Sequence, residues 1–222
     1  MVFHLISNKY ETTKWLANVS EKIHQYLLAN TLDVSRRLNK LITSNGPIFL
    51  KVQRSGDLIL QLAKIVAGQQ LSTKAADSIW SRVELMINEN DTTVSKLFVG
   101  KNSNILRSCG LSRNKIRAII GMVASFKAKK LSKEALFEKE YTSLTQAITS
   151  LWGFGVWSSD MVAISFFGHE DVWPDKDLAI RKGIERLAEN DFDKQQEILN
   201  VCSPYRTYLA RHIWQGLDQK KI

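Results

Sequence analysis

The 222-residue sequence predicts an all-α protein, because apolar residues recur at spacings of three and four along most of its length. Serine stands directly before two of these periodic segments, at Ser72 and Ser112, where a helix N-cap is expected. Alternating strand patterns are scarce, and VFHLI near the beginning is the only tempting one. We therefore expect about ten helices joined by short loops.

Periodicity and turn residues place the individual helices. Trp15, Val19 and Ile23 share one face of the first helix, and Gly153 ends another where a left-handed residue is usually needed. The PDKD stretch precedes a further apolar-periodic segment, with Asp177 directly before it. In chain order, the main predicted helices cover residues 11–29, 57–68, 72–88, 113–128, 143–151, 157–167, 178–189 and 204–217.

The composition favours a polyanionic partner. Lysine and arginine number 31 against 22 acidic residues, for a net charge of +9, which favours nucleic acid or an acidic membrane surface. No apolar run approaches the roughly 20 residues of a membrane span, and the start lacks the basic leader of a signal peptide. The two cysteines, Cys109 and Cys202, argue against a disulfide framework, and the histidines lack zinc-ligand spacing. We therefore expect an intracellular protein, either in a bacterial or archaeal cytoplasm or in a eukaryotic nucleus, with no membrane partner.

The stretch LWGFGVW at residues 151–157 breaks one helix and starts the next at once. Such a turn leaves the first backbone amides of the second helix without intrahelical acceptors, and these amides can bind an anion. In a chain of charge +9 the expected anion is a nucleic-acid phosphate. The alternative is an ordinary tight turn between two helices that Gly153 caps.

Four further stretches give this hairpin a context. The whole set resembles the helix-hairpin-helix DNA glycosylases that carry a Gly/Pro-rich loop and a catalytic aspartate, and most of all the alkyladenine branch, the 3-methyladenine DNA glycosylase II type. The motifs that carry the resemblance are LWGFG (151–155), PDKDLAIR (174–181), AGQQLSTKAADSIWSRV (67–83), CGLSRNKIRAI (109–119) and PYRTYLARHIW (204–214).

The resemblance implies one glycosylase unit over residues 1–222, built as two helical lobes with the active site in the cleft between them. The terminal lobe would comprise residues 1–55 and 170–222 and carry Asp177, and residues 56–169 would form the central lobe. The implied activity is monofunctional excision of alkylated purines of the 3-methyladenine type. The enzyme would act as a monomer on duplex DNA with a damaged base, flip the nucleotide and leave an abasic site, with no catalytic cofactor. Two alternatives remain open: a glycosylase of the same fold for uracil or hypoxanthine, and a non-catalytic protein that binds damaged or abasic DNA.

Asp177 falls on the catalytic aspartate of the family. Breaking an N-glycosidic bond produces an oxocarbenium-like sugar, and a fixed carboxylate stabilises its charge and can activate water. The alternative is that Asp177 only caps the helix that follows, and both roles can hold together. Asp175 does not align with the motif, and Lys176 is expected to be a solvated lysine.

Trp157 occupies the position where bifunctional relatives carry the lysine that forms a Schiff base. Because an indole cannot form an imine, we expect no lyase step at abasic sites. The alkyladenine enzymes also place tryptophan here, as a wall of the base pocket, and an aromatic ring favours an electron-poor alkylated base. The alternative is that Trp157 fills the core at the start of its helix. Trp173, Phe49 and Trp80 are further aromatic candidates that cannot be placed from the sequence.

The expected DNA contacts form two groups. In the hairpin they are Gly153, Phe154, Gly155 and Val156; the carbonyls of residues 151–155 are also a candidate site for a monovalent cation, although no metal is required. The second group contains Gln69, Gln70 and Leu71, since Gln70 aligns with the residue that relatives insert into the gap left by the flipped nucleotide. The alternative is a polar loop that caps the helix after it. Trp152 departs from the family, which has proline there, and the sequence offers no firm account of it.

Overall fold

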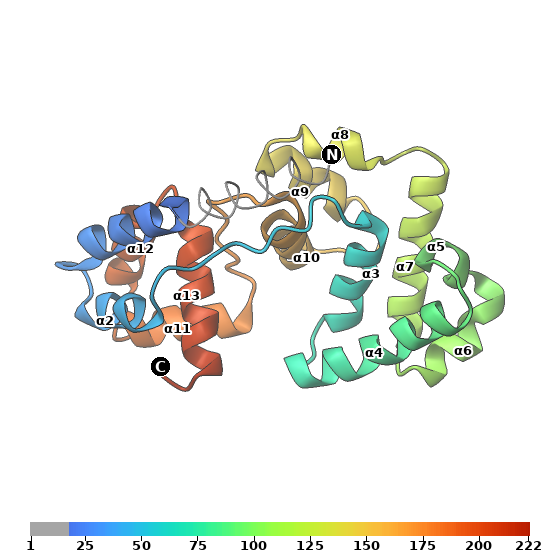
Figure 1. Cartoon of the computed structure of the whole chain (residues 1–222), viewed down its shortest axis with the longest axis horizontal. Coiled ribbons are helices and arrows are strands. Elements are labelled where there is room, and N and C mark those ends of the chain that lie inside the picture. The colour runs from blue at the N-terminus through green and yellow to red at the C-terminus, as the bar shows by residue number, and fades with distance from the viewer. Residues whose placement is uncertain (1–17) are drawn as a thin grey trace, which may run out of the picture. The chain divides into compact units, whose positions relative to one another are not determined.

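The computed structural model describes residues 18–222, and every regular element in that range is helical (Figure 1). The tempting VFHLI strand, Trp15 and the start of the first predicted helix lie outside these residues. Residues 18–31 are helical. The elements that follow are α2 (Arg36–Asn45), α3 (Leu58–Gly68), α4 (Thr73–Glu89), α5 (Val94–Leu97), η1 (Gly100–Asn102), α6 (Ser103–Ser108), α7 (Arg113–Lys127), α8 (Lys133–Phe137), α9 (Tyr141–Thr149), α10 (Val156–Val162), η2 (Ala163–Phe167), α11 (Leu178–Leu187), α12 (Phe192–Val201) and α13 (Arg206–Asp218).

The chain divides into two compact units. The terminal unit comprises Met1–Lys51 and His169–Ile222, and the central unit comprises Val52–Gly168. In the terminal unit, α13 packs against α2 and α11. Gly183 lets α11 approach α13 closely, because a Cβ at this position would lie 2.2 Å from Cγ2 of Ile213. The fully buried side chains at this centre include Leu27, Leu38, Ile42, Ile180, Leu209 and Ile213.

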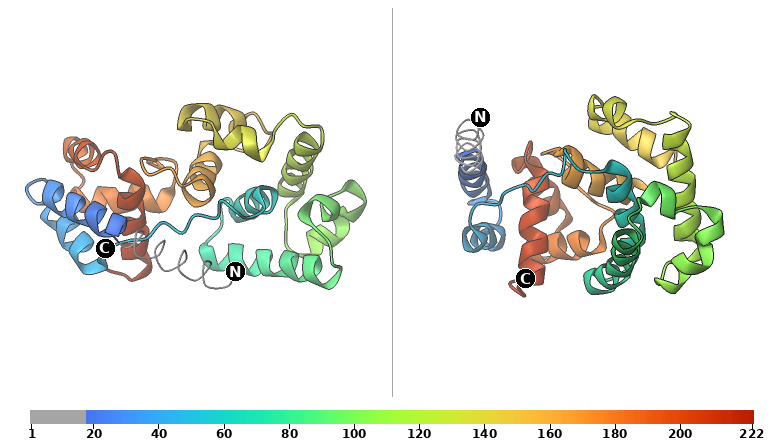
Figure 2. Two further views of the ribbon diagram at one scale, coloured as in Figure 1. Left: turned by 45° about the horizontal axis from the view of Figure 1, so that its top comes forward. Right: turned by 45° about the vertical axis from the view of Figure 1, so that its right-hand side comes forward.

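Helix α3 is the centre of the central unit. It contacts α4, α5, α7 and α10, and its side chains Leu62, Ala63, Val66 and Ala67 are completely buried. Helices α3 and α4 form the teal-to-green part of the unit in both views of Figure 2. A helix with so much of its surface apolar is stable only when neighbours surround it.

The N-caps expected from the sequence are confirmed where local chemistry decides them. The hydroxyl of Ser72 accepts from the Ala75 amide at 3.3 Å, and the hydroxyl of Ser112 accepts from the Lys115 amide at 3.2 Å. The helix predicted over 157–167 is present, but it is α-helical only as far as Val162, and a π-helical turn completes it. In this wider turn the carbonyl of Ser165 accepts from the Gln53 amide and its hydroxyl accepts from the Gln61 side chain.

Candidate active site and nucleic-acid interface

Asp177 lies at the N-terminus of α11, where its carboxylate has a fixed orientation. Its Oδ1 atom accepts from the amides of Ala179 and Ile180, each at 3.0 Å, so the expected N-cap is confirmed. Its own amide donates to the carbonyl of Pro174 at 2.9 Å. Trp214 on α13 places its indole Nε1 3.4 Å from the same Oδ1 atom. The terminal unit therefore holds this carboxylate from its own helix and from a second helix.

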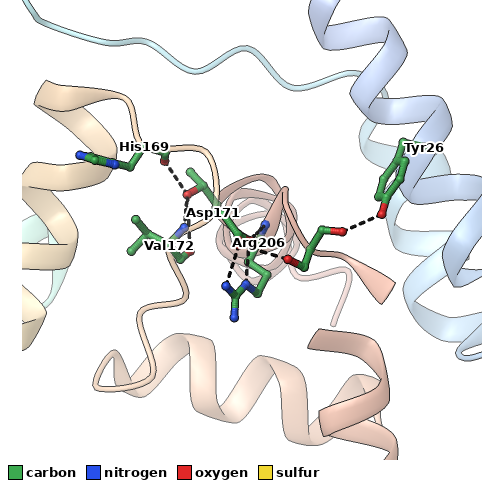
Figure 3. Close-up of polar contacts among 7 residues, drawn as sticks. Tyr26, His169, Asp171, Val172 and Arg206 are labelled. Atoms are coloured by element: carbon green, nitrogen blue, oxygen red, sulfur yellow. Dashed lines mark hydrogen bonds and ion pairs between the residues drawn. The ribbon is translucent and has the colours of Figure 1, made fainter. Parts of the chain in front are cut away.

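The segment before α11 is clamped by the first turn of α13 (Figure 3). Arg206 donates from Nε and Nη2 to the two oxygens of Asp171 at 2.7 and 2.6 Å, and these hydrogen bonds lower the pKa of that carboxyl. The Thr207 hydroxyl donates to the carbonyl of His169 at 2.7 Å and accepts from the Val172 amide at 3.0 Å. The Pro-Tyr-Arg-Thr motif thus anchors the chain that leads to α11.

The other candidates near Asp177 have ordinary surroundings. Lys176 is exposed, and its ammonium lies 3.0 Å from the carboxylate of Asp175, as a solvated lysine would. Trp173 is partly buried against the core of the terminal unit, whereas Phe49 is 48% exposed. Trp80 lies in the central unit, where it is 2% exposed and donates to Glu84 at 2.7 Å.

The hairpin joins α9 to α10 within the central unit. Gly153 has a φ of +85°, and a Cβ there would lie 2.6 Å from the Cβ of Ala118 on α7. Glycine is therefore required at this position for two reasons, the backbone conformation and the close approach to α7. Below the turn, the hydroxyl of Tyr141 on α9 donates to the buried Asp160 carboxylate on α10 at 2.5 Å.

The start of α10 exposes backbone donors. Gly155 is its N-cap residue and supplies no side chain to cap the helix, and a Cβ at this position would meet nothing within 4 Å. The carbonyl of Gly155 accepts from Ser158 and Ser159, but the Gly155 and Val156 amides donate to no acceptor within residues 18–222. Both residues are exposed, whereas Phe154 between the two glycines is 5% exposed and packs inward. This geometry can bind an anion at the amides.

Gln69 and Lys115 support the hairpin and the turn after α3. The Gln69 side chain donates to the carbonyl of Gly153 at 3.0 Å and to the hydroxyl of Ser158 at 2.8 Å. The Lys115 ammonium donates to the carbonyls of Ala67 and Gln69 at 2.9 and 2.8 Å, and burial lowers its pKa. These contacts join the Gln-Gln motif, the Leu-Ser-x-x-Lys motif and the hairpin into one assembly.

Gln70 and Leu71 lie differently from Gln69. Gln70 has a φ of +56°, which is uncommon for a residue other than glycine, and its side chain is exposed. Leu71 is 40% exposed. These two exposed residues follow directly on Gln69, whose side chain is anchored to the hairpin.

The two tryptophans of the hairpin have separate environments. Trp157 is the second residue of α10 and is partly buried. Trp152 is 50% exposed, and the guanidinium carbon of Arg117 on α7 lies 4.2 Å from the centre of its ring. Sequence reasoning missed this contact and the Trp214–Asp177 contact. The sequence signal for both residues is that they lie in stretches that carry the family resemblance, Arg117 in CGLSRNKIRAI and Trp214 in PYRTYLARHIW.

Within residues 18–222, no group of three or more His, Cys, Asp or Glu side chains could hold a metal ion. No helix in the described part of the chain is both long and apolar enough to cross a membrane.

Comparison with known proteins supports the fold of the chain, although no family model matches it. DNA-3-methyladenine glycosylase 1 of Schizosaccharomyces pombe is 29% identical over 170 residues, which cover 70% of each chain. The structure of the S. pombe 3-methyladenine DNA glycosylase in complex with abasic DNA has a TM-score of 0.75 and 24% identity, over 89% of this chain and 97% of that one. A DNA-3-methyladenine glycosidase from Bacillus halodurans has a TM-score of 0.66 and 24% identity, over 84% and 86% of the two chains. The predicted all-α fold of this group is confirmed.

Proposed function

We propose that this chain, a member of the helix-hairpin-helix DNA glycosylase superfamily, excises alkylated purines of the 3-methyladenine type from duplex DNA. It hydrolyses the N-glycosidic bond and leaves an abasic site. Support comes from the S. pombe relative named as a DNA-3-methyladenine glycosylase and from the likeness to that organism's enzyme in complex with abasic DNA. The observation that carries the proposal for this chain is the fixed carboxylate of Asp177.

Asp177 acts on the sugar of the flipped nucleotide. As the base departs, positive charge develops at C1′, and a preoriented carboxylate stabilises it without having to reorganise. The same carboxylate orients the water that attacks C1′ or accepts its proton, which then passes to solvent, while the cationic alkylated base leaves with the bonding electrons as a neutral molecule. Two backbone amides and the Trp214 indole hold the carboxylate, so its orientation is set before substrate binds.

The hairpin and the turn after α3 position the DNA. The exposed amides at the start of α10 bind a backbone phosphate, which fixes the register of the protein without reading sequence. Gln70 and Leu71 are the exposed members of their group and form the wedge that fills the gap left by the flipped nucleotide. Gln69 contributes by supporting the hairpin from below.

Trp157 determines the type of chemistry. Its ring stacks on the alkylated base, whose electron-poor face favours an aromatic partner. Because no amine stands at this position, the enzyme releases the base without cutting the strand. Borohydride trapping on a damaged duplex is therefore expected to yield no covalent adduct, and a stable protein–DNA adduct would contradict the monofunctional mechanism.

The deciding experiment measures release of 3-methyladenine from methylated DNA by the wild type and by Asp177→Asn. Asparagine caps helices as well as aspartate does, so this variant keeps the fold while losing the charge. We expect its rate to fall by about 100-fold or more. Asp191→Asn is the matched control, because Asp191 caps α12 in the same unit with a 3.0 Å hydrogen bond from the Lys194 amide. The control is expected to retain wild-type activity.

Two outcomes would replace the proposal. A wild type that releases uracil or hypoxanthine, but no 3-methyladenine, would show the alternative glycosylase of the same fold. A wild type that binds damaged or abasic duplexes and releases no base would be a non-catalytic binding protein.

Equal activity of Asp177→Asn and the wild type would remove Asp177 from the mechanism. Gel filtration with and without duplex would test the expected monomer.

A further inference from the structure

A surface hollow of about 440 Å³ lies in the central unit, between α6 and α7. These two helices pack side by side (Figure 1). Three arginines line it, Arg107 from α6 and Arg113 and Arg117 from α7. The other lining residues are the polar Ser103 and Asn104 and the apolar Ile116 and Ile120. We call it the arginine hollow. None of its functional groups enters the proposed chemistry of base release.

The charge of the arginine hollow is uncompensated. The ion pairs found within residues 18–222 involve other side chains, so none of the three guanidinium groups there has a carboxylate within 4.0 Å. All three arginines are exposed. A concave surface lined by one sign of charge concentrates the potential and attracts ions of opposite charge. Guanidinium groups also match phosphate oxygens through paired N–H donors, which a lysine cannot do.

Arg117 connects the arginine hollow to the hairpin. Its guanidinium carbon lies 4.2 Å from the centre of the Trp152 ring, close enough for a cation–π interaction. The next residue, Ala118, is the one that Gly153 approaches closely. One turn of α7 therefore contacts the hairpin and lines the hollow. Trp152, which is 50% exposed, offers the guanidinium group a flat aromatic face.

We propose that the arginine hollow binds backbone phosphates of duplex DNA and extends the hairpin contact along α7. Duplex DNA is the occupant that fits, because its phosphates form a continuous row of negative charge that can meet several guanidinium groups at once. The choice of DNA rests on the proposed function, but the prediction concerns binding of the duplex and not removal of the base.

The test compares the wild type with R107Q/R113Q/R117Q in the full chain. Affinity for an undamaged duplex, and for the same duplex with a stable abasic-site analogue, is measured by fluorescence anisotropy over a range of salt concentrations. Each phosphate contact contributes about 0.9 to the slope of log affinity against log salt, so the slope should fall by up to about 2.7. The affinity difference between wild type and variant would then shrink by up to about 40-fold between roughly 50 and 200 mM salt.

The control K96Q/K129Q/K130Q removes the same charge from exposed lysines of the central unit that lie outside the hollow. It should change the slope much less. Equal slopes for the wild type and the arginine variant, or equal losses in both triple variants, would overturn the proposal. Unfolding in urea checks that both variants remain folded.

Two further measurements separate this proposal from the proposed function. The lysine control K96Q/K129Q/K130Q should release base at the wild-type rate, whereas the arginine variant should release base more slowly at enzyme concentrations that do not saturate the DNA. If the wild type binds duplex through the hollow but releases no base, only the glycosylase assignment is overturned. If the wild type releases base but the arginine variant keeps the wild-type salt slope, only the proposal for the hollow is overturned. Trp152→Ala should weaken binding, and its effect should shrink when Arg117→Gln is already present. Additive effects would contradict the support role of Trp152.

Discussion

Replacing Gly153 by alanine is expected to destabilise the central unit strongly. The substitution forces an L-residue to a φ of +85° and places its Cβ 2.6 Å from the Cβ of Ala118. The left-handed conformation costs about 1–2 kcal/mol, and overpacking a rigid contact costs about 1–3 kcal/mol more. Together these costs predict a loss of roughly 2–5 kcal/mol, which lowers the melting temperature by roughly 4–20 °C.

Gly155→Ala is the matched comparison within the same hairpin. Its φ of −105° suits any residue, and a Cβ there meets nothing within 4 Å. We expect a change in stability of about 1 kcal/mol or less, because the weaker N-cap and the reduced freedom of the unfolded chain oppose each other. The added methyl stands beside the exposed amides, so this variant should lose DNA affinity while it keeps its stability.

The assay is urea and thermal unfolding of both variants, with Ala118→Gly in each background. Ala118→Gly should cost about 1 kcal/mol by itself, as a glycine inside a helix does. In the Gly153→Ala background it should instead restore part of the lost stability, since it removes the clashing Cβ. Wild-type stability of Gly153→Ala, or an identical cost of Ala118→Gly in both backgrounds, would refute the reasoning.

Three other predictions test contacts outside the hairpin. Burial, with the charges of His24 and Lys221, lowers the pKa of His212 to about 3. Below pH 6.5 the imidazole of His212 therefore binds a proton in the unfolded chain but not in the folded chain, and the free energy of unfolding should fall by about 2 kcal/mol on going to pH 5. If the urea midpoint of His212→Gln fell as steeply with pH, this explanation would be contradicted. Thr207→Val should cost about 1–3 kcal/mol in urea unfolding, because it leaves the buried Val172 amide without its acceptor, and a neutral result would show that the clamp is dispensable. Lys115→Met should lower the free energy of unfolding by about 1–3 kcal/mol and weaken duplex binding, because the turn after α3 loses its hydrogen bonds from Lys115. Unchanged duplex affinity in anisotropy titrations would show that this turn does not contribute to DNA binding.

Local chemistry explains why several elements could be predicted from the sequence. The helices over 57–68, 72–88 and 113–128 match α3, α4 and α7 closely, since each has a polar cap residue followed by regular apolar spacing. Short helices such as α5 and α8 were not predicted, because four or five residues hold no period and form only when neighbours pack on them. The π turn after α10 also escaped prediction, because the hydrogen bonds that accompany it come from Gln53 and Gln61, about a hundred positions away.

For the candidate site, the sequence by itself determined how two of the proposed residues begin or end a helix. Asp177 as a cap and Gly153 as a left-handed turn follow from neighbours within three residues. Only the tertiary structure decided which side chains meet: Trp214 with Asp177 across 37 positions, and Gln69 with the hairpin across 84. The physical reason is that capping and backbone conformation depend on adjacent residues, whereas contacts between helices depend on how the whole unit packs.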